Sequence, residues 1–243
     1  MKSMMRKNYN LWKKSYQSRK NYSTTNPHLF FKIAAKYLPP NEKAIIVDIG
    51  AGNGKFEDYL KLVNKYKNLF LLDGNSETIE NLKGRYKNAI PYRVPDKLPF
   101  ESATVSYVIC SHLIEHLYYQ EFYKFLKEID RILDKDGILV IISPLLWSTF
   151  YSDLSHVKPY NPDVFLRYLC QKTENRSHVA ISQEYSILEL IYRYTNIDIN
   201  EGWGSSSFII DFLIQLLKKV LYKLRIQKYA KNGYLLVLKK NQN

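Results

Sequence analysis

Three glycines at alternate positions follow an apolar run in the first quarter of the chain. The run Ala44–Ile49 predicts a buried strand, and Gly50, Gly52 and Gly54 come directly after it. Glycine lets the backbone turn sharply and lets a ligand approach the main chain closely. Because ligands of α/β sheets bind at the carboxyl ends of the strands, this turn predicts a ligand site at that edge.

The spacing of the glycines separates this turn from two common phosphate-binding loops. A dinucleotide fingerprint reads G-x-G-x-x-G, and Lys55 stands where its third glycine would be. The loop of nucleoside triphosphatases needs a lysine followed by Ser or Thr, and that pair is absent here. The sequence therefore disfavours both NAD and a nucleoside triphosphate.

A carboxylate stands at the end of the next predicted strand. Asp73 closes the run 68–73, about 20 residues past the glycine turn, where an acidic side chain can accept hydrogen bonds from ribose hydroxyls. The alternative is that Asp73 only caps the following helix. Taken with Asp48 on the first strand and with the glycines, the ribose role is favoured.

The elements that position these residues follow from the alternation of apolar runs with amphipathic stretches, which is typical of a parallel sheet covered by helices. We expect strands at 44–49, 68–73, 88–94, 104–110 and 138–142, and helices at 26–37, 56–66, 76–86 and 120–133. Beyond Pro144 the pattern is weaker, and we expect a loop at 151–160, a helix at 161–170, a strand and a helix within 186–200, a helix at 208–228 and a last strand at 233–239.

Several segments in the right order resemble one family. The run 47–56 looks like motif I of the class I methyltransferases that use S-adenosylmethionine (SAM), and Asp73 looks like their ribose-binding residue. The segments 98–117 and 134–143 resemble the motifs that follow in the UbiE/type-11 branch. The resemblance covers about 44–144, with a weaker likeness at 233–239. It implies an α/β, Rossmann-like sandwich, whose seven-stranded, mostly parallel sheet has the order 3-2-1-4-5-7-6 and carries helices on both faces.

The resemblance also implies a cofactor and the residues that hold it. SAM would be bound and S-adenosylhomocysteine (SAH) released, with the glycines around the methionine part, Asp48 near its amino group and Asp73 on the ribose. The family often has an acidic residue for the adenine amino group where Val94 stands here, and Asp96 is the expected substitute. The implied cofactor-binding residues are Asp48, Gly50, Ala51, Gly52, Gly54, Asp73, Gly74, Asp96, Leu98, Cys110 and Ser111.

Candidate catalytic residues follow from the chemistry of methyl transfer. The reaction is an in-line displacement in which the protein positions the reactants and supplies a general base where the acceptor loses a proton. His156, in a segment that resembles a substrate-side element of small-molecule methyltransferases, is the best candidate base, with Asp153 as its orienting partner. The alternative for His156 is a loop residue that caps the helix after it. His112 is a further candidate, and His116 is expected to be structural.

No group of His, Cys and acidic residues has the spacing of metal ligands, so no metal site is predicted. The two cysteines, Cys110 and Cys170, are too few for a disulfide framework and suit a reducing cytosol. The N-terminus has no apolar signal segment, and no apolar run is long enough to span a bilayer. We expect a cytoplasmic protein.

The organisation that we expect is a helical cap over 1–40 and a SAM-binding domain over 41–243, with a substrate-side insertion at about 151–229. Within the insertion, 208–228 is apolar and ends in basic residues. It reads as a core or dimer helix, or as an interfacial helix that contacts the inner face of an anionic membrane.

The net charge of +13 can attract nucleic acid, anionic membranes or acidic substrates. The charges are spread along the chain and no nucleic-acid-binding signature accompanies them, which disfavours nucleic acid as a partner. The resemblance to class I methyltransferases therefore implies SAM-dependent methyl transfer, and we expect the acceptor to be an oxygen or nitrogen of a small molecule or glycan. Two alternatives stay open: an RNA methyltransferase that uses the basic surface, and a SAM/SAH-binding module without catalysis.

Overall fold

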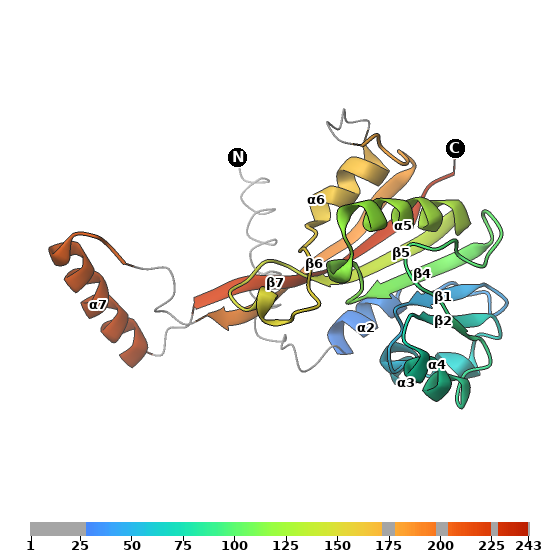
Figure 1. Ribbon diagram of the computed structural model, residues 1–243, viewed down its shortest axis with the longest axis horizontal. Helices are drawn as coiled ribbons and strands as arrows, with labels where there is room; N and C mark the ends of the chain where they lie inside the picture. Colours follow the sequence, from blue (N-terminus) through green and yellow to red (C-terminus); the bar gives the residue numbers. More distant parts are fainter. Residues whose placement is uncertain (1–27, 172–177, 198–203, 225–227, 243) are drawn as a thin grey trace, which may run out of the picture. The chain divides into compact units, whose positions relative to one another are not determined.

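A seven-stranded sheet forms the centre of the computed structural model, which describes residues 28–171, 178–197, 204–224 and 228–242. The strand order is β3-β2-β1-β4-β5-β7-β6 (Figure 1). Strands β1 to β5 pair in parallel, and β7 runs antiparallel to β5. The predicted fold class and strand order are confirmed. The strands are β1 Ile46–Ile49, β2 Leu69–Asp73, β3 Ala89–Pro91, β4 Val105–Ser111, β5 Leu133–Pro144, β6 Tyr185–Ile197 and β7 Lys228–Lys240.

Helices lie on both sides of this sheet. Figure 1 draws α5 and α6 above the strands and α2, α3 and α4 below them. The α-helices are α2 His28–Ala35, α3 Lys55–Leu60, α4 Ser76–Lys83, α5 Tyr119–Ile132, α6 Pro162–Phe165 and α7 Phe208–Lys223. Short helical turns are η1 Leu62–Asn64, η2 Ile114–His116, η3 Phe150–Ser152 and η4 Leu166–Cys170, the last of which is a π-helical turn.

The apolar runs of the sequence account for the core. All four residues of β1 are buried, as expected for a central strand with helices on both faces. Helix α5 buries Phe122, Phe125, Leu126 and Ile129, which recur at the spacing of one helical face. The rings of Phe122 and Phe165 meet edge to face at 5.7 Å and join α5 to α6.

Predictions for the first part of the chain agree with the structure to within three residues, with two exceptions. The strand expected at 138–142 already begins at Leu133, and the helix expected over 56–66 is divided. Lys61 takes a left-handed conformation (φ 53°), so α3 ends there and the turn η1 follows. Beyond Pro144 the differences are larger. The helix over 161–170 is a four-residue α6 continued by a π-helical turn, and 186–197 is all strand because it pairs in the sheet beside β7. Tertiary pairing has overridden local preference there.

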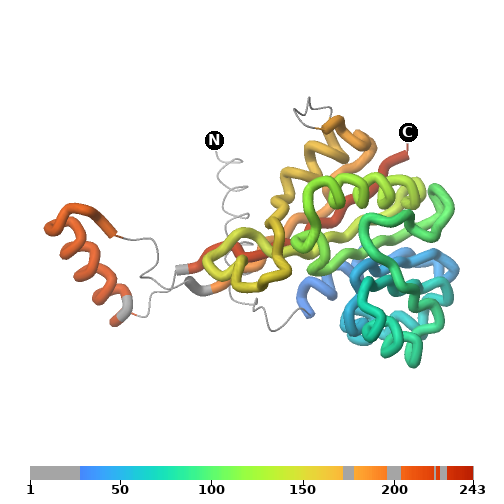
Figure 2. Tube along the Cα trace, in the orientation of Figure 1, coloured from blue at the N-terminus to red at the C-terminus, as the bar shows by residue number. Residues whose placement is uncertain are grey.

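The contacts within the chain divide it into two compact units. One comprises 27–191 and 233–243, and the other comprises 1–26 and 192–232. Figure 2 shows the last described residues of the first unit running beside β5. In the second unit, Arg193 donates through Nε to the side-chain oxygen of Asn232 at 3.0 Å. Most of the predicted cap, up to residue 27, lies outside the described residues, and the predicted limits at 40 and at 151–229 stay predictions.

Two buried carboxyl groups lie where β1 meets α3. Asp48 and Glu57 are 3% and 1% exposed. One oxygen of Asp48 and both oxygens of Glu57 have no hydrogen-bond partner in the described part of the chain. Burial raises the pKa of Asp48 well above its ordinary range, and the neighbouring Glu57 and Asp73 raise it further. Burial also raises the pKa of Glu57 to about 7. Burial therefore disfavours the ionised forms of Asp48 and Glu57 in the folded state.

Replacing Glu57 with Gln should stabilise the protein more at pH 8 than at pH 5. In the folded chain Glu57 keeps its proton until about pH 7, whereas its ordinary pKa is 4.5. Stability is therefore lost as the pH rises through this window, because the unfolded state binds fewer protons. The neutral amide removes that loss. We expect a gain of about 2 kcal/mol at pH 8, or roughly 4–8 °C in Tm, and a smaller gain at pH 5.

The measurement is thermal unfolding of the native chain and of Glu57→Gln at both pH values. The exposed Glu42→Gln is the matched control and should change Tm little at either pH. Equal destabilisation of Glu57→Gln at pH 5 and pH 8 would contradict the account.

Candidate active site

The glycine turn is fastened to the neighbouring strand by main-chain hydrogen bonds. The amides of Gly50 and Ala51 both donate to the carbonyl of Leu72, at 2.8 and 3.1 Å. Gly50, Gly52 and Gly54 all have positive φ, at 78°, 52° and 68°. Residues that carry a side chain rarely adopt this backbone conformation, and a Cβ on Gly50 would also lie 3.3 Å from Leu113. The turn therefore depends on glycine for its conformation.

Asp73 joins this turn to the start of the next helix. Its Oδ2 accepts the Gly52 amide and its Oδ1 accepts the Asn75 amide, both at 2.9 Å. Asn75 caps α4, because its side chain accepts the amides of Glu77 and Thr78 at 2.9 and 3.1 Å. The alternative that Asp73 caps this helix is therefore wrong. Asp73 therefore links the glycine turn to the loop that leads into α4.

A pocket of about 250 Å³ opens at this edge of the sheet. It includes Gly50 and Gly74 from the predicted cofactor residues, and it adds Tyr92, Arg93 and Glu121, which the sequence did not single out. The full lining is Ile49, Gly50, Gly74, Tyr92, Arg93, Val94, Leu113, His116, Leu117 and Glu121. Tyr92 and Arg93 follow β3 in a segment without a periodic pattern, and Glu121 lies in the first turn of α5, so the sequence offered no signal that singled them out.

Four other predicted cofactor residues, Cys110, Ser111, Leu98 and Asp96, are not among the residues that line this pocket. Cys110 is buried on β4, where it pairs with Ile49 of β1, and burial raises the pKa of its thiol. Ser111 follows at the half-buried end of the strand. Leu98 is buried and its amide donates to Glu128 at 2.9 Å, so it packs in the core. The exposed Asp96 accepts Tyr92 Oη on its carbonyl at 2.7 Å.

His112 stands at the end of β4 with a positive φ of 54°. Its amide donates to Ile142 at 2.8 Å, and its Nδ1 lies 3.2 Å from Oε1 of Glu115. Positive φ in a non-glycine residue is uncommon and is often found at functional sites. The side chain is 48% exposed and is therefore accessible from solvent.

His156 is held by a backbone carbonyl. Its Nδ1 lies 2.7 Å from the carbonyl oxygen of Phe150, and its Nε2 lies 3.9 Å from Oδ2 of Asp153. The oxygen Oδ1 of Asp153 accepts both the amide and the hydroxyl of Ser155. The hydrogen-bond partner of Nδ1 is therefore the Phe150 carbonyl, whereas the Asp153 carboxylate faces Nε2. Helix α6 has no side-chain cap, so capping does not account for His156.

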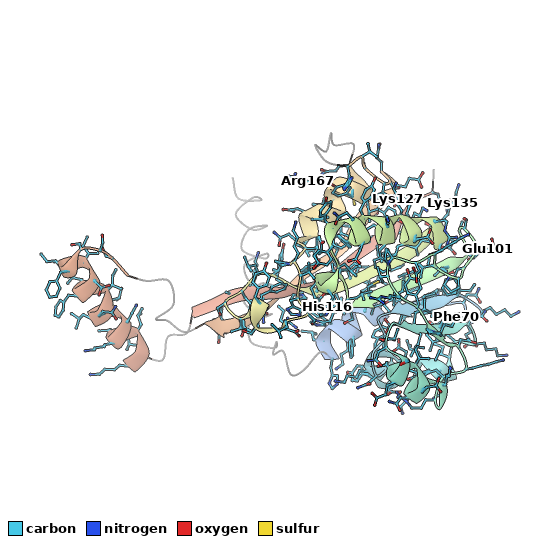
Figure 3. The ribbon with its side chains drawn as sticks, viewed as in Figure 1. Phe70, Glu101, His116, Lys127, Lys135 and Arg167 are labelled. Carbon is cyan, nitrogen blue, oxygen red and sulfur yellow. The ribbon has the colours of Figure 1, made fainter. Side chains whose placement is uncertain are left out.

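The structure brings a third group to this place. Glu115, which has no exposed surface, accepts the amides of Val157 and Lys158 on its backbone carbonyl at 2.8 and 3.2 Å. His116 Nδ1 lies 3.0 Å from the carbonyl oxygen of Ser155. These bonds dock the loop around 155–158 onto η2. Figure 3 labels His116 at the side of the sheet to which the strand arrows point.

One potential ligand atom from each of Glu115, His116 and His156 lies within 4.8 Å of the other two. Sequence spacing gave no sign of this cluster, because His156 is about 40 residues further along the chain. The contact depends on how the loop after β5 packs.

A second pocket, of about 340 Å³, lies between α5, α6 and the segment 158–161. Aromatic rings dominate its lining, including Tyr119, Tyr123, Tyr160 and Tyr168. It contains none of the predicted cofactor or catalytic residues.

Residues 47–141 match a family model described as a methyltransferase domain of type 11. No match was found among the curated proteins. A SAM-dependent methyltransferase from Archaeoglobus fulgidus has a similar structure, with 20% identity and a TM-score of 0.56 over 88% of this chain and 95% of the other. YcgJ from Bacillus subtilis has 13% identity and a TM-score of 0.57 over 89% and 100%.

Geranyl diphosphate C-methyltransferase from Streptomyces coelicolor is a further similar structure, with 10% identity and a TM-score of 0.55 over 88% and 77% of the two chains. At these identities the structural likenesses show the fold. The family model adds the domain type over the part of the chain that carries the glycine turn, Asp73 and β4. The resemblance to the type-11 branch is thus confirmed over residues 47–141, the part of the chain that matches the methyltransferase domain model, and the whole sheet has the strand order that the resemblance implied.

Proposed function

We propose that the chain transfers a methyl group from SAM to an oxygen or nitrogen of a small-molecule or glycan acceptor at the carboxyl edge of the sheet. The observation that carries the proposal is the Asp73 carboxylate, which fixes the glycine turn beside a pocket lined by Gly50 and Gly74.

The cofactor-binding residues are proposed from the strand ends that meet there. Gly50, Ala51, Gly52 and Gly54 would surround the methionine part of SAM, with Asp48 beneath them. Asp73 and Gly74 would hold the ribose. Cys110 and Ser111 would offer backbone carbonyls to the ammonium group, and Asp96 and Leu98 would border the adenine. Of the residues near the adenine, Arg93 and Val94 line the pocket and Asp96 does not.

The chemistry asks little of the protein beyond positioning. The sulfonium of SAM is a good leaving group, so the protein gains rate by placing acceptor and methyl group in line. An acceptor that must lose a proton needs a base within hydrogen-bond reach. His112 and His156 are the proposed candidates, with Asp153 beside Nε2 of His156.

Thermal unfolding with SAM and with SAH tests the cofactor site. Ligand at a hundredfold excess over its Kd adds about 2.7 kcal/mol, which is roughly 5–10 °C for a domain of this size. Asp73→Ala should lose most of this shift, because it removes both the ribose acceptor and the anchor of Gly52. Asp163→Ala, an exposed residue in the first turn of α6, is the matched control and should keep it.

The absence of any shift at millimolar ligand, in a folded sample, would contradict the proposal at its first step. If SAM binds, transfer of labelled methyl to the fractions of a cell extract tests the acceptor class. Label in small molecules or glycans supports the proposal. Label that a ribonuclease removes from macromolecules would instead support RNA methylation, and binding with no transfer would support a non-catalytic module.

A peripheral membrane contact through α7 is a second proposal, supported by the helix itself. Eight of its large apolar side chains are exposed, from 45% for Val220 to 84% for Phe208, and Lys219 and Lys223 lie toward its C-terminus. No helix in the described part of the chain is long and apolar enough to cross a membrane. An apolar face with basic residues suits a helix that lies in the interface of an anionic bilayer.

Sedimentation with vesicles tests this contact. The chain should bind vesicles that contain anionic lipid and should bind neutral vesicles weakly. Removing two charges with Lys219→Gln and Lys223→Gln should lower binding about tenfold or more, since each basic residue near the surface contributes about 1 kcal/mol. The matched control, Lys65→Gln with Lys87→Gln, removes the same charge from exposed positions elsewhere. Equal loss in both pairs, or no binding by the native chain, would rule out a specific role for α7.

A further inference from the structure

We propose that Glu115, His116 and His156 form a site for a divalent transition metal ion of the Zn²⁺ type. Each offers one ligand atom, and the three atoms lie within 4.8 Å of one another. Donors around four-coordinate zinc lie about 3.4 Å apart, because zinc–nitrogen and zinc–oxygen bonds are about 2.0–2.1 Å long. Small side-chain rotations therefore bring the three atoms to the distances that an ion requires. This inference does not rest on the proposed acceptor or on catalysis.

The carboxylate is the first reason to expect a cation. Glu115 has no exposed surface. Within the described part of the chain its oxygens make only long contacts, with Nδ1 of His112 at 3.2 Å and with the hydroxyl of Ser143 at 3.3 Å. A buried carboxylate needs strong partners to offset the loss of water. A metal ion beside Glu115 would stabilise the carboxylate more strongly than these two long hydrogen bonds do.

The orientation of the imidazoles is the second reason. Nδ1 of His116 faces the Ser155 carbonyl at 3.0 Å, and Nδ1 of His156 faces the Phe150 carbonyl at 2.7 Å. A carbonyl only accepts, so each Nδ1 carries the hydrogen and each Nε2 carries the lone pair. Histidines that ligate metals are commonly fixed in this way by a carbonyl on the other ring nitrogen.

The backbone holds the two ligand segments together without an ion. The Glu115 carbonyl accepts the amides of Val157 and Lys158 at 2.8 and 3.2 Å, which fastens the loop to η2. The His156 ring also stacks on Phe150, with centroids 4.6 Å apart. The ligands are therefore positioned before binding, which lowers the entropy that binding would cost.

The donor set selects the class of metal. Two imidazole nitrogens and one carboxylate oxygen suit zinc and its neighbours in the first transition row, whereas Mg²⁺ and Ca²⁺ prefer oxygen alone. Three protein ligands leave a fourth position open on zinc. Asp153, whose Oδ2 is 3.9 Å from Nε2 of His156, is the nearest further carboxylate to that nitrogen among the described contacts.

Metal binding would change the role of one predicted residue. The lone pair on Nε2 of His156 can accept a proton or bind an ion, and it cannot do both at once. A metal ligand role therefore removes His156 from the candidate bases and leaves His112 as the remaining one. Because His116 also lines the pocket beside Gly50, the ion would lie at the wall of that pocket.

Titration of the chelator-treated, full-length chain with Zn²⁺ alone tests the site. We expect one ion per chain with a Kd of about 1 µM or tighter. His116→Gln and His156→Gln should each weaken binding by at least about 100-fold, since changes even to groups that only support ligands cost 10–100-fold. His28→Gln, a histidine stacked on Tyr59 outside the cluster, is the matched control and should bind as the native chain does.

Cobalt gives a second readout that does not depend on folding energy. Co²⁺ bound by these ligands should produce visible absorption bands that both histidine variants lose and His28→Gln keeps. Circular dichroism of each variant checks that it folds. No stoichiometric binding by the native chain, or zinc that remains in the double variant of His116 and His156, would overturn the proposal. The SAM-induced thermal shift needs no metal, so a failure here is distinct from a failure of the proposed function.

Discussion

The hydrogen bonds of one carboxylate hold the functional edge of this molecule together. Asp73 accepts the amide of Gly52 with one oxygen and the amide of Asn75 with the other, both at 2.9 Å. The first bond fixes the turn after β1, and the second fixes the loop that leads into α4. Because β1 and β2 are parallel neighbours, both loops leave the sheet at the same edge. Hydrogen bonds from amides to a carboxylate are roughly twice as strong as hydrogen bonds between neutral groups.

The strands that frame this edge could be predicted because they are short apolar runs between glycine, proline and charged residues. Burial on both faces makes such a run apolar throughout, and this pattern can be read without the fold. Fewer elements of the second half of the chain could be predicted. The segment 185–197 mixes polar and apolar residues without a strict period, and whether it becomes strand or helix depends on β7, which comes later in the chain. The π-helical turn at 166–170 has no local signal at all.

The same distinction applies to the site. The glycine turn and Asp73 could be predicted because their spacing is set by a strand, a helix and a strand in succession. The capping role of Asn75 was missed because Asp73 stands two residues before it and could have capped as well. Glu115 could not be identified as buried, since an acidic residue in a loop is usually exposed. The contact of His116 with His156, at 5.1 Å between ring centroids, depends on loop docking that sequence spacing does not record.

The position of β7 has a consequence for how the chain must assemble. This strand lies between β5 and β6 although it follows both in the sequence. During synthesis, β6 leaves the ribosome with no neighbour to pair with, and the apolar edge of β5 stays open until residues 233–239 have been made. The sheet therefore closes by inserting its latest strand into an interior place, and not by adding strands outward. Loop closure over such separations is slow, so the half-finished sheet presents an unpaired edge, the feature that invites aggregation, until β7 pairs.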